Sequence, residues 1–280
     1  MTGPRYLTRT MVRDLLDRHG LAPSRALGQN FLCDPGTVDK IVRLAGVTAD
    51  DHVVEIGAGL GSLTVGLAAT GAEVLAVEVD RYLLPALTET VGELDVAVHH
   101  GDARELDWPS LLAGREWIVV ANLPYNIATP LLLDFLAERP ELTRWLVMVQ
   151  REAGERLVAG PGSRIYGIPS VLAAFWADSR IVATVRPELF LPKPKVESVL
   201  VEIVRKSEPP TDVRFEDVAV LVRAGFGQRR KMIRRSLASL VSHDVLEAAG
   251  VAPTARAEQL TLHDWCALAR VYSVARDSSD

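Results

Sequence analysis

Residues 52–80, HVVEIGAGLGSLTVGLAATGAEVLAVEVD, give the clearest indication of the fold. The apolar run HVVEIG predicts a buried strand, and EVLAVEVD at the other end predicts a second one. The residues between them predict a helix that ends at Gly71. A strand, a helix and a strand in this order form a βαβ unit, in which the two strands run parallel.

The same alternation continues toward the C-terminus. Three further strands are predicted around the segments VAVHHGD, WIVVAN and RWLVMVQ, and the last two flank a helix from Ala128 to about Glu138. Unbroken apolar strands between helices are typical of a parallel sheet that is covered on both faces. The segments RIVATVRPELF and SVLVEIVRK predict two later strands that add an antiparallel edge. We therefore predict an α/β fold with a Rossmann-like, mostly parallel sheet.

The part of the chain beyond about residue 206 differs from the part before it. SEPPTD (207–212) has the composition of a linker, and every longer segment after it predicts helix. We therefore predict a main α/β domain over residues 1–206 and a small, all-helical domain over residues 213–280. Within the first twenty residues, Met11, Leu15 and Leu16 recur at helical spacing and predict a short amphipathic helix.

Composition narrows the class of protein. Of the 280 residues, 48% are hydrophobic and 24% charged, the balance of a soluble globular protein, and the apolar runs are too short to span a membrane. The charged N-terminus does not resemble a secretory signal, and the isolated Cys33 and Cys266 favour a reducing cytoplasm. No zinc-type spacing of Cys and His occurs, so we expect no metal. The net charge of −5, taken alone, argues weakly against a nucleic-acid partner.

The loop after the first strand of the βαβ unit predicts a cofactor site. Gly57, Gly59 and Gly61 allow a ligand close to the backbone, and the following helix offers free N–H groups. The spacing G-x-G-x-G, preceded by the acidic Glu55, resembles S-adenosylmethionine (SAM) methyltransferases rather than the dinucleotide fingerprint. Glu78, at the end of the next strand, is predicted to accept hydrogen bonds from the ribose hydroxyls. The alternative is a tight, glycine-rich turn without a ligand.

A further carboxylate follows the next predicted strand. Asp102 comes directly after VAVHHG, at the edge where open α/β sheets bind ligands. We expect it to accept a hydrogen bond from the exocyclic amino group of the cofactor adenine, although a lone Asp also suits a cap or a turn. Asp80, which precedes a predicted helix, is interpreted as a helix cap.

The segment Asn122-Leu123-Pro124-Tyr125 ends another strand at the same edge. The pattern (N/D/S)-x-P-(Y/F) resembles methyltransferases that act on amino groups attached to aromatic rings or amides. The lone pair of such a nitrogen is delocalised into the ring, and acceptors on its N–H groups localise it for attack. We predict that the Asn122 side-chain oxygen and the Pro124 carbonyl are these acceptors, and that Asn122 also contacts the cofactor. Tyr125 is predicted either to stack on the target base or to face the sulfonium carbon. The alternative is a strand-to-helix turn with a buried tyrosine.

Seven segments together carry a resemblance that covers nearly the whole chain: GQNFL (28–32), EIGAGLGSLT, GDA, NLPYNIATPLL, PGSRIYG (161–167), FLPKPKVESVLV (190–201) and QRRKMIRRSL (228–237). In this order they resemble the ribosomal RNA adenine N6,N6-dimethyltransferase family, and within it the members that act on 16S RNA. Two positions depart from the family pattern, Ala58 where proline is frequent and Leu27 where an aromatic residue is common.

The resemblance implies a function and further site residues. It implies that two adjacent adenines near the 3′ end of 16S RNA, in the small (30S) subunit or its precursor, are each dimethylated with SAM as the methyl donor. It also implies that Asn30 and Leu32 contact SAM and that Phe190 stacks on the flipped adenine opposite Tyr125. We expect a monomer that has no membrane or metal partner.

Cationic residues are concentrated in one segment of the chain, although the net charge is negative. Six cations lie within thirteen positions without one acid: Arg223, Arg229, Arg230, Lys231, Arg234 and Arg235. A charge run is usually a solvated helix face, but such a cluster in an acidic protein predicts contact with RNA phosphates. RNA would then be recognised by shape and backbone, with a single-stranded adenine splayed into the site.

Three other functions remain open from the sequence. A DNA adenine methyltransferase more often has proline where this chain has Leu123. A large-subunit RNA methyltransferase of the antibiotic-resistance type would share the fold and the chemistry. A ribosome-assembly factor with secondary catalysis is the third, and the intact glycine loop and NLPY segment argue against it.

Overall fold

The computed structural model describes residues 6–125, 127–210 and 212–277. The chain divides into two compact units. The first, which we call the sheet unit, comprises Met1–Gly154 and Arg180–Val204, and the second, the helical unit, comprises Glu155–Ser179 and Arg205–Asp280. Among the described residues, no helix has the length and apolar character that a membrane crossing requires.

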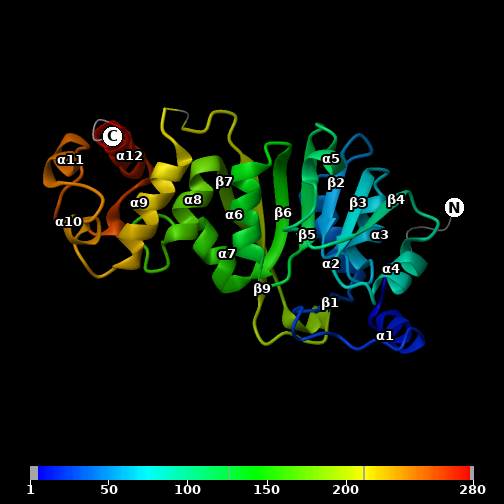
Figure 1. Ribbon diagram of the computed structural model, residues 1–280. Coiled ribbons are helices and arrows are strands. Elements are labelled where there is room, and N and C mark those ends of the chain that lie inside the picture. The colour runs from blue at the N-terminus through cyan, green and yellow to red at the C-terminus, as the bar shows by residue number, and fades with distance from the viewer. Residues whose placement is uncertain (1–5, 126, 211, 278–280) are drawn as a thin grey trace. The chain divides into compact units, whose positions relative to one another are not determined.

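A seven-stranded sheet forms the frame of the sheet unit (Figure 1). Its strand order is β4-β3-β2-β5-β6-β9-β7. The strands β4, β3, β2, β5 and β6 pair in parallel, and β9 pairs antiparallel with β6. The predicted Rossmann-like sheet with an antiparallel addition at one edge is therefore confirmed. The strands are β2 (His52–Ile56), β3 (Glu73–Glu78), β4 (Val96–His100), β5 (Trp117–Asn122), β6 (Leu142–Gln150), β7 (Ala177–Val185) and β9 (Ser198–Arg205).

The central strands are buried because their side chains are apolar on both faces. Val53 and Val54 on β2, and Val120 on β5, have no exposed side-chain surface. Burial of this kind drives the packing of helices against both faces of a sheet. The helices of the sheet unit are α1 (Arg9–Arg18), α2 (Pro35–Ala45), α3 (Ser62–Ala68), α4 (Leu84–Val91), α5 (Trp108–Leu112) and α6 (Ala128–Glu138). Helix α7 (Arg151–Val158) begins in the sheet unit and ends in the helical unit.

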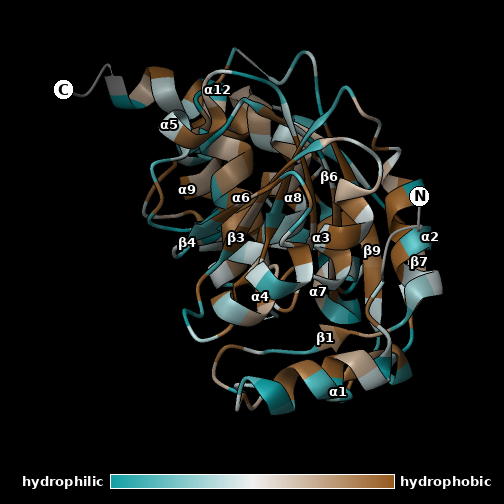
Figure 2. Ribbon diagram, turned by 90° about the vertical axis from the view of Figure 1, so that its right-hand side faces the viewer, coloured by the Kyte–Doolittle hydropathy of each residue, from teal (hydrophilic) through white to brown (hydrophobic). Residues whose placement is uncertain are grey.

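The N-terminal helix α1 is amphipathic, as its sequence predicts. Its buried residues, Val12, Leu15 and Leu16, recur at helical spacing, and Figure 2 shows its mixed hydrophobic and hydrophilic surface. Thr8 caps the helix by accepting a hydrogen bond from the Met11 N–H at 3.4 Å. Met11, which the sequence also places in the apolar pattern, is only partly buried.

A second, two-stranded sheet was not predicted. β1 (Phe31–Leu32) pairs antiparallel with β8 (Phe190–Leu191), so that Leu32 lies opposite Phe190. The Cys33 N–H extends the pairing by donating to the Leu189 carbonyl at 2.9 Å. This small sheet joins two segments that carry the family resemblance and lie far apart in the sequence.

The helical unit is built around buried side chains of α9 and α12. These are Val218, Leu221 and Val222 on α9 and Trp265 and Leu268 on α12. The helices, which run from green to red in Figure 1, are α8 (Ile168–Trp176), α9 (Phe215–Gly227), α10 (Ile233–Ser236), α11 (His243–Ala248) and α12 (Leu262–Asp277).

Helix α8 belongs to the helical unit, whereas the sequence assigns it to the domain over residues 1–206. The reason is aromatic packing: the rings of Phe175 and Trp176 lie 5.2 and 5.3 Å from that of Phe215, at the start of α9. The boundary at residue 206 and the linker over residues 207–212 remain predictions about domain organisation.

Candidate functional site

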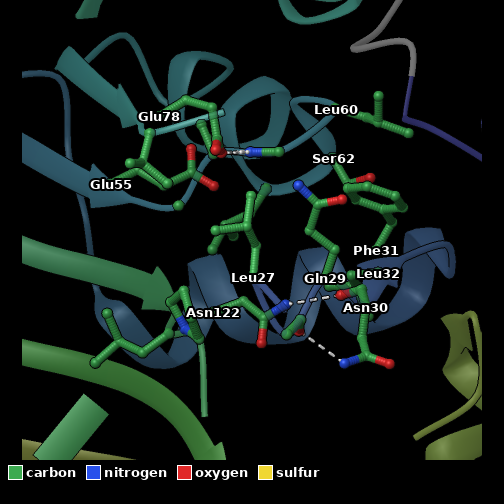
Figure 3. A pocket seen from close by; sticks show the side chains of 18 of the residues that line it. Leu27, Gln29, Asn30, Phe31, Leu32, Glu55, Leu60, Ser62, Glu78 and Asn122 are labelled. Carbon is green, nitrogen blue, oxygen red and sulfur yellow. Dashed lines mark hydrogen bonds between the residues drawn. The ribbon is translucent and has the colours of Figure 1, made fainter. Parts of the chain in front are cut away.

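A pocket lies at the carboxyl ends of β2, β3 and β5. Three segments line it: the glycine loop that follows β2, the segment Asn122–Tyr125 that follows β5, and residues 27–32. Figure 3 shows their side chains around the same space. The structure thus brings together three of the segments that the sequence analysis singles out. It is also the position at which open α/β sheets bind ligands.

The glycine loop depends on its glycines for conformation and for space. Gly57 and Gly59 have φ angles of 77° and 60°, in the left-handed region that side chains with a Cβ rarely adopt. A Cβ at Gly59 would lie 3.2 Å from the Phe31 ring, and one at Gly57 would lie 3.5 Å from Pro124 Cδ. The backbone of this loop therefore forms a wall of the pocket. A residue with a side chain at Gly57 or Gly59 would take up space beside that wall.

Gly61 has a different surrounding. It does not line the pocket, and a Cβ there would lie 3.0 Å from Thr90 Cγ2 and 3.1 Å from Leu87 Cδ1 on α4. Close packing of α3 against α4 and a φ of 87° account for this glycine. Its predicted contact with the cofactor is therefore not supported by its position.

Glu78 ends β3 with its carboxylate in the pocket wall (Figure 3). Its side chain is 4% exposed. One oxygen accepts a hydrogen bond from the Gly59 N–H at 2.7 Å, and the other accepts from the Asp80 N–H at 2.8 Å. Burial raises the pKa of Glu78, and these two N–H groups oppose that rise. The carboxylate oxygens retain lone pairs that ribose hydroxyls could occupy.

A second carboxyl, Glu55, lies in the same pocket at the end of β2. It is 2% exposed, and its Oε2 accepts a hydrogen bond from the Thr64 hydroxyl at 2.5 Å. Burial raises the pKa of Glu55 to about 8; the Thr64 hydrogen bond lowers it and the neighbouring Glu78 raises it further. In the sequence, Glu55 stands out only as the acid before the glycine loop.

The polar groups of this pocket fit SAM. The buried Ser62 Oγ lines the pocket and has no hydrogen-bond partner among the described residues, so it can bond to a ligand. The described lining contains Glu55 and Glu78 but no Lys, Arg or His. A pocket with acidic groups and without basic ones favours a cationic ligand, and SAM carries a sulfonium and an ammonium group.

Asp102 lines an adjoining pocket that shares Leu27, Gly57, Val79 and Pro124 with the first one. Its carboxylate is bound by the Arg104 guanidinium, with N–O distances of 2.6 and 3.1 Å, which lowers the pKa of Asp102. The walls are otherwise largely apolar, which suits a flat aromatic ring. Hydrogen bonding of Asp102 to the cofactor adenine remains a prediction.

The Asn122 side chain has a fixed orientation. Its amide nitrogen donates to the Asn30 carbonyl at 3.2 Å, so the amide oxygen is the group left to accept a hydrogen bond (Figure 3). The family resemblance implied that Asn30 contacts the cofactor, but its role in orienting Asn122 was not predicted. The Asn30 side chain itself donates to the Gly28 carbonyl at 2.9 Å.

The predicted role of the Pro124 carbonyl needs correction. This oxygen already accepts from the N–H groups of Ile127 and Ala128, at 3.2 and 3.1 Å, where helix α6 begins. Two hydrogen bonds use both lone pairs of a carbonyl oxygen. The Leu123 carbonyl, by contrast, accepts none of the turn and loop hydrogen bonds found among the described residues.

Tyr125 is held in the pocket wall by a residue that the sequence analysis missed. Its hydroxyl and Ser198 Oγ are 2.9 Å apart, and Ser198, at the start of β9, is completely buried. Burial raises the pKa of Tyr125, while the Ser198 hydrogen bond lowers it. The only signal in the sequence was the position of Ser198 within the segment FLPKPKVESVLV.

The segment over residues 24–32 is tied to the pocket by hydrogen bonds. Gln29 Nε2 donates to Asp80 Oδ2 at 2.7 Å, and Gln29 Oε1 accepts from the Ser24 N–H at 2.7 Å. Asp80 also accepts from the Tyr82 N–H at 3.0 Å, within the turn that precedes α4. Its interpretation as the helix cap was wrong, because α4 begins at Leu84 and its N-cap position is Leu83. Leu32 lines the pocket and is 3% exposed.

Phe190 does not line the pocket. Its side chain has no exposed surface and belongs to the apolar core that includes Leu32, Val38 and Leu200. Packing in this core is sufficient to account for an aromatic residue at position 190. Stacking of Phe190 on the target adenine remains a prediction drawn from the family resemblance.

The predicted RNA-binding cations lie in the helical unit, but they do not form one helix. Helix α9 ends at Gly227 and α10 begins at Ile233, so residues 228–232 form the turn between them. Three of the cations, Arg230, Lys231 and Arg235, line a surface concavity together with Arg256, which sequence analysis missed. Arg223 and Arg234 are exposed and do not line it.

Arg229 has structural partners instead. Its guanidinium lies 2.9 Å from Glu258 and donates to the Arg164 carbonyl at 2.7 Å. It also lies 5.9 Å from the centre of the Phe226 ring. These contacts join three segments of the helical unit and compete with a role in RNA binding.

Comparison with known proteins supports the same reading. The family model described as ribosomal RNA adenine dimethylase matches residues 22–273. A protein of Leifsonia xyli, named ribosomal RNA small subunit methyltransferase A, is 46% identical, over 95% of this chain and 98% of that protein. A Thermobifida fusca protein of the same name is 43% identical, over 95% of this chain and 96% of that protein.

Two solved structures are similar over most of the chain. A dimethyladenosine transferase from Plasmodium falciparum has a TM-score of 0.74 and 26% identity, and the match covers 85% of this chain and 95% of that one. The 23S rRNA methyltransferase ErmE has a TM-score of 0.67 and 26% identity, with coverage of 87% and 100%. The predicted SAM-dependent adenine methyltransferase activity on ribosomal RNA is confirmed. The chain belongs to the ribosomal RNA adenine dimethylase family.

Proposed function

We propose that the protein dimethylates N6 of two adjacent adenines near the 3′ end of 16S RNA, within the small subunit or its precursor, during ribosome assembly in the cytoplasm. The relatives named small subunit methyltransferase A support the choice of subunit. The observation that carries the chemistry is the Asn122 amide beside the acidic pocket, whose nitrogen is held by the Asn30 carbonyl and whose oxygen accepts no hydrogen bond from the described residues. We further propose that the protein acts as a monomer.

In this proposal the two adjoining pockets hold the cofactor. Glu78 accepts hydrogen bonds from the ribose hydroxyls, and the backbone of Gly57 and Gly59 allows the cofactor close to the loop. The apolar slot between Val79 and Ile127 takes the adenine ring, whose amino group meets Asp102. Leu32 and the backbone of Asn30 close the opposite wall.

The cofactor supplies an electrophilic methyl group, and the chain's own residues prepare the attacking nitrogen. The Asn122 side-chain oxygen accepts a hydrogen bond from an N–H of the target amine and thereby localises the nitrogen lone pair. The Leu123 carbonyl is the second acceptor in place of that of Pro124. Tyr125, fixed through Ser198, stacks on the target base. Catalysis then consists of alignment and preorganised polar contacts, without a general base for the attack.

Cationic side chains of the helical unit bind the RNA backbone. The concavity formed by Arg230, Lys231, Arg235 and Arg256 is suited to phosphate groups, because it presents several cations to one region of surface. Arg223 and Arg234 add to the positive surface, whereas Arg229 holds the unit together through Glu258. Recognition through phosphates is consistent with selection of RNA by shape.

The experiment that tests the substrate is primer extension on ribosomal RNA from cells with and without the protein. A dimethylated adenine blocks reverse transcription, so the proposal predicts stops near the 3′ end of 16S RNA only in cells that have the protein. The similarity to ErmE makes 23S RNA the second candidate. Stops that depend on the protein but lie in 23S RNA would replace the first candidate by the second.

A further inference from the structure

Two buried carboxyl groups lie on neighbouring strands of the cofactor pocket. Glu55 is 2% exposed at the end of β2, and Glu78 is 4% exposed at the end of β3, which pairs with β2 in parallel. Figure 3 shows both on the same side of the pocket. Their hydrogen bonding differs: two backbone N–H groups donate to Glu78, whereas the Thr64 hydroxyl is the side-chain donor to Glu55.

Burial and the like charge of Glu78 disfavour the charged form of Glu55, and the hydrogen bond from Thr64 offsets them only in part. From β3 it meets Glu78, which carries the same charge, and from α3 it meets Thr64, which carries none. The described residues of the other two walls, Leu27–Leu32 and Asn122–Tyr125, carry no charged side chain, and the raised pKa of Tyr125 keeps its hydroxyl neutral. With a pKa of about 8, Glu55 is mostly the neutral acid at pH 7 in the cofactor-free protein.

We propose that Glu55 loses its proton when SAM binds and regains it after methyl transfer, so that this carboxyl distinguishes the cofactor, which carries a sulfonium charge, from its product, which carries a neutral thioether in that place. The proposal rests on the assignment of SAM to this pocket. SAM carries one positive charge more than S-adenosylhomocysteine (SAH), on its sulfur. A cation in a buried pocket stabilises a nearby carboxylate, and its removal restores the penalty of burying that carboxylate beside Glu78.

The charges balance over one turnover. On SAM binding, the Glu55 proton passes to solvent. In methyl transfer, the bond between carbon and sulfur breaks with its electron pair left on sulfur, and the N6 lone pair forms the new bond. N6 then sheds its proton to water. Glu55, now beside a neutral thioether, takes up one proton from solvent. The proposal thus predicts that the protein binds SAH less tightly than SAM, because only SAM offers a sulfonium charge to the Glu55 carboxylate.

The test is calorimetry of SAM and SAH binding in buffers that differ in ionisation enthalpy. At pH 7 the wild-type protein should release close to one proton for each SAM bound and almost none for SAH. SAM affinity should rise with pH, by up to about tenfold per pH unit, and level off above a pH near the Glu55 pKa of about 8. The sign follows because the free protein binds the extra proton.

The variant Glu55→Gln shows how much of the measured proton release comes from Glu55 and how much comes from the ligand. The ligand's amino group also titrates, but it does so equally with both proteins. In the variant the proton release specific to SAM should disappear. The preference for SAM over SAH at pH 7 should fall by about tenfold, because near-complete proton release at that pH requires the Glu55 pKa to fall by about two units when SAM binds. Equal proton release by the wild type and the variant, or none by the wild type, overturns the proposal.

A second variant keeps the test independent of how Glu55→Gln folds. Thr64→Val removes the hydroxyl that stabilises the carboxylate, so it should move the midpoint of the pH dependence of SAM affinity to higher pH. An unmoved midpoint contradicts the proposal. Failure of the pocket assignment looks different: SAM affinity would then be unchanged at every pH by Glu55→Gln, by Thr64→Val and by Glu78→Ala.

Discussion

At the scale of single residues, Glu78 illustrates why a side chain can serve the ligand and the fold together. We expect Glu78→Ala to weaken SAM binding by roughly 1.5–3 kcal/mol, the value of hydrogen bonds to a charged group. It should also lower stability, because the Gly59 and Asp80 N–H groups lose their acceptor. Calorimetry measures the affinity, and Glu73→Ala, on an exposed residue at the other end of β3, is the control. Unchanged SAM affinity would remove Glu78 from the site.

Ser198 gives a second prediction at this scale. Ser198→Ala and Tyr125→Phe each delete the hydrogen bond between the two hydroxyls, so both should lower the methylation rate severalfold with little change in SAM affinity. Because they remove one shared interaction, the double variant should lose no more than either single variant. The measurement is a double-mutant cycle: single-turnover methylation by the wild type, the two single variants and the double variant. Additive losses would show that the two hydroxyls act separately.

The sequence reveals which residue types stand at the site but not how they are held. Glu78, Asn122 and Tyr125 were predicted because their order after strands is informative. The Asn30 carbonyl and the Ser198 hydroxyl could not be found in this way, because a single polar atom contributed by a distant segment leaves no pattern. The Pro124 carbonyl was misjudged because a residue pattern does not show which hydrogen bonds a turn has already made.

At the scale of elements, substitutions in the glycine loop can distinguish the effect of backbone strain from the effect of steric crowding. Gly59 and Gly114 have similar φ angles, 60° and 68°, but only at Gly59 would a Cβ meet another group, the Phe31 ring at 3.2 Å. Both Gly59→Ala and Gly114→Ala should therefore lower stability by roughly 1–2 kcal/mol. Only Gly59→Ala should also weaken SAM binding. Thermal unfolding and calorimetry on both variants test this, and equal SAM affinities would show that the loop tolerates the displacement of Phe31.

The regular elements could be predicted because they are long and apolar, as β2 and β5 are. The pairing of β1 with β8 could not, because strands of two residues have no periodicity and their partner is far away in the sequence. The helix expected through the cationic segment was wrong over residues 228–232. The chain leaves the helical conformation at Gln228, the C-cap of α9, and charge alone gave no indication of the turn.

At the scale of the whole molecule, a protein with a net charge of −5 is proposed to bind RNA through one cationic concavity. Arg235→Glu should lower affinity for 30S particles and flatten its dependence on salt by roughly one phosphate contact. SAM affinity should not change. Arg214→Glu, an equal change of charge at another exposed site in the helical unit, is the control. Identical salt slopes for the two variants would exclude the concavity as a phosphate site.

The domain boundary at residue 206 was predicted from composition alone. The linker composition indicated where the sheet ends, but α8 joins the helical unit because Phe175 and Trp176 pack against Phe215. Such packing depends on residues on both sides of the linker, which composition does not relate to one another.

The central claim is that Asn122 polarises the attacking nitrogen, and one measurement tests it most directly. Single-turnover methylation of 30S particles at saturating SAM compares Asn122→Ala with the wild type, while calorimetry follows SAM affinity. The interaction strengthens in the transition state, so its loss should lower the rate by on the order of 10²–10³ while the particles are still bound. A variant whose rate stays within about threefold of wild type, well short of the roughly 1.4 kcal/mol of a tenfold effect, would contradict the account.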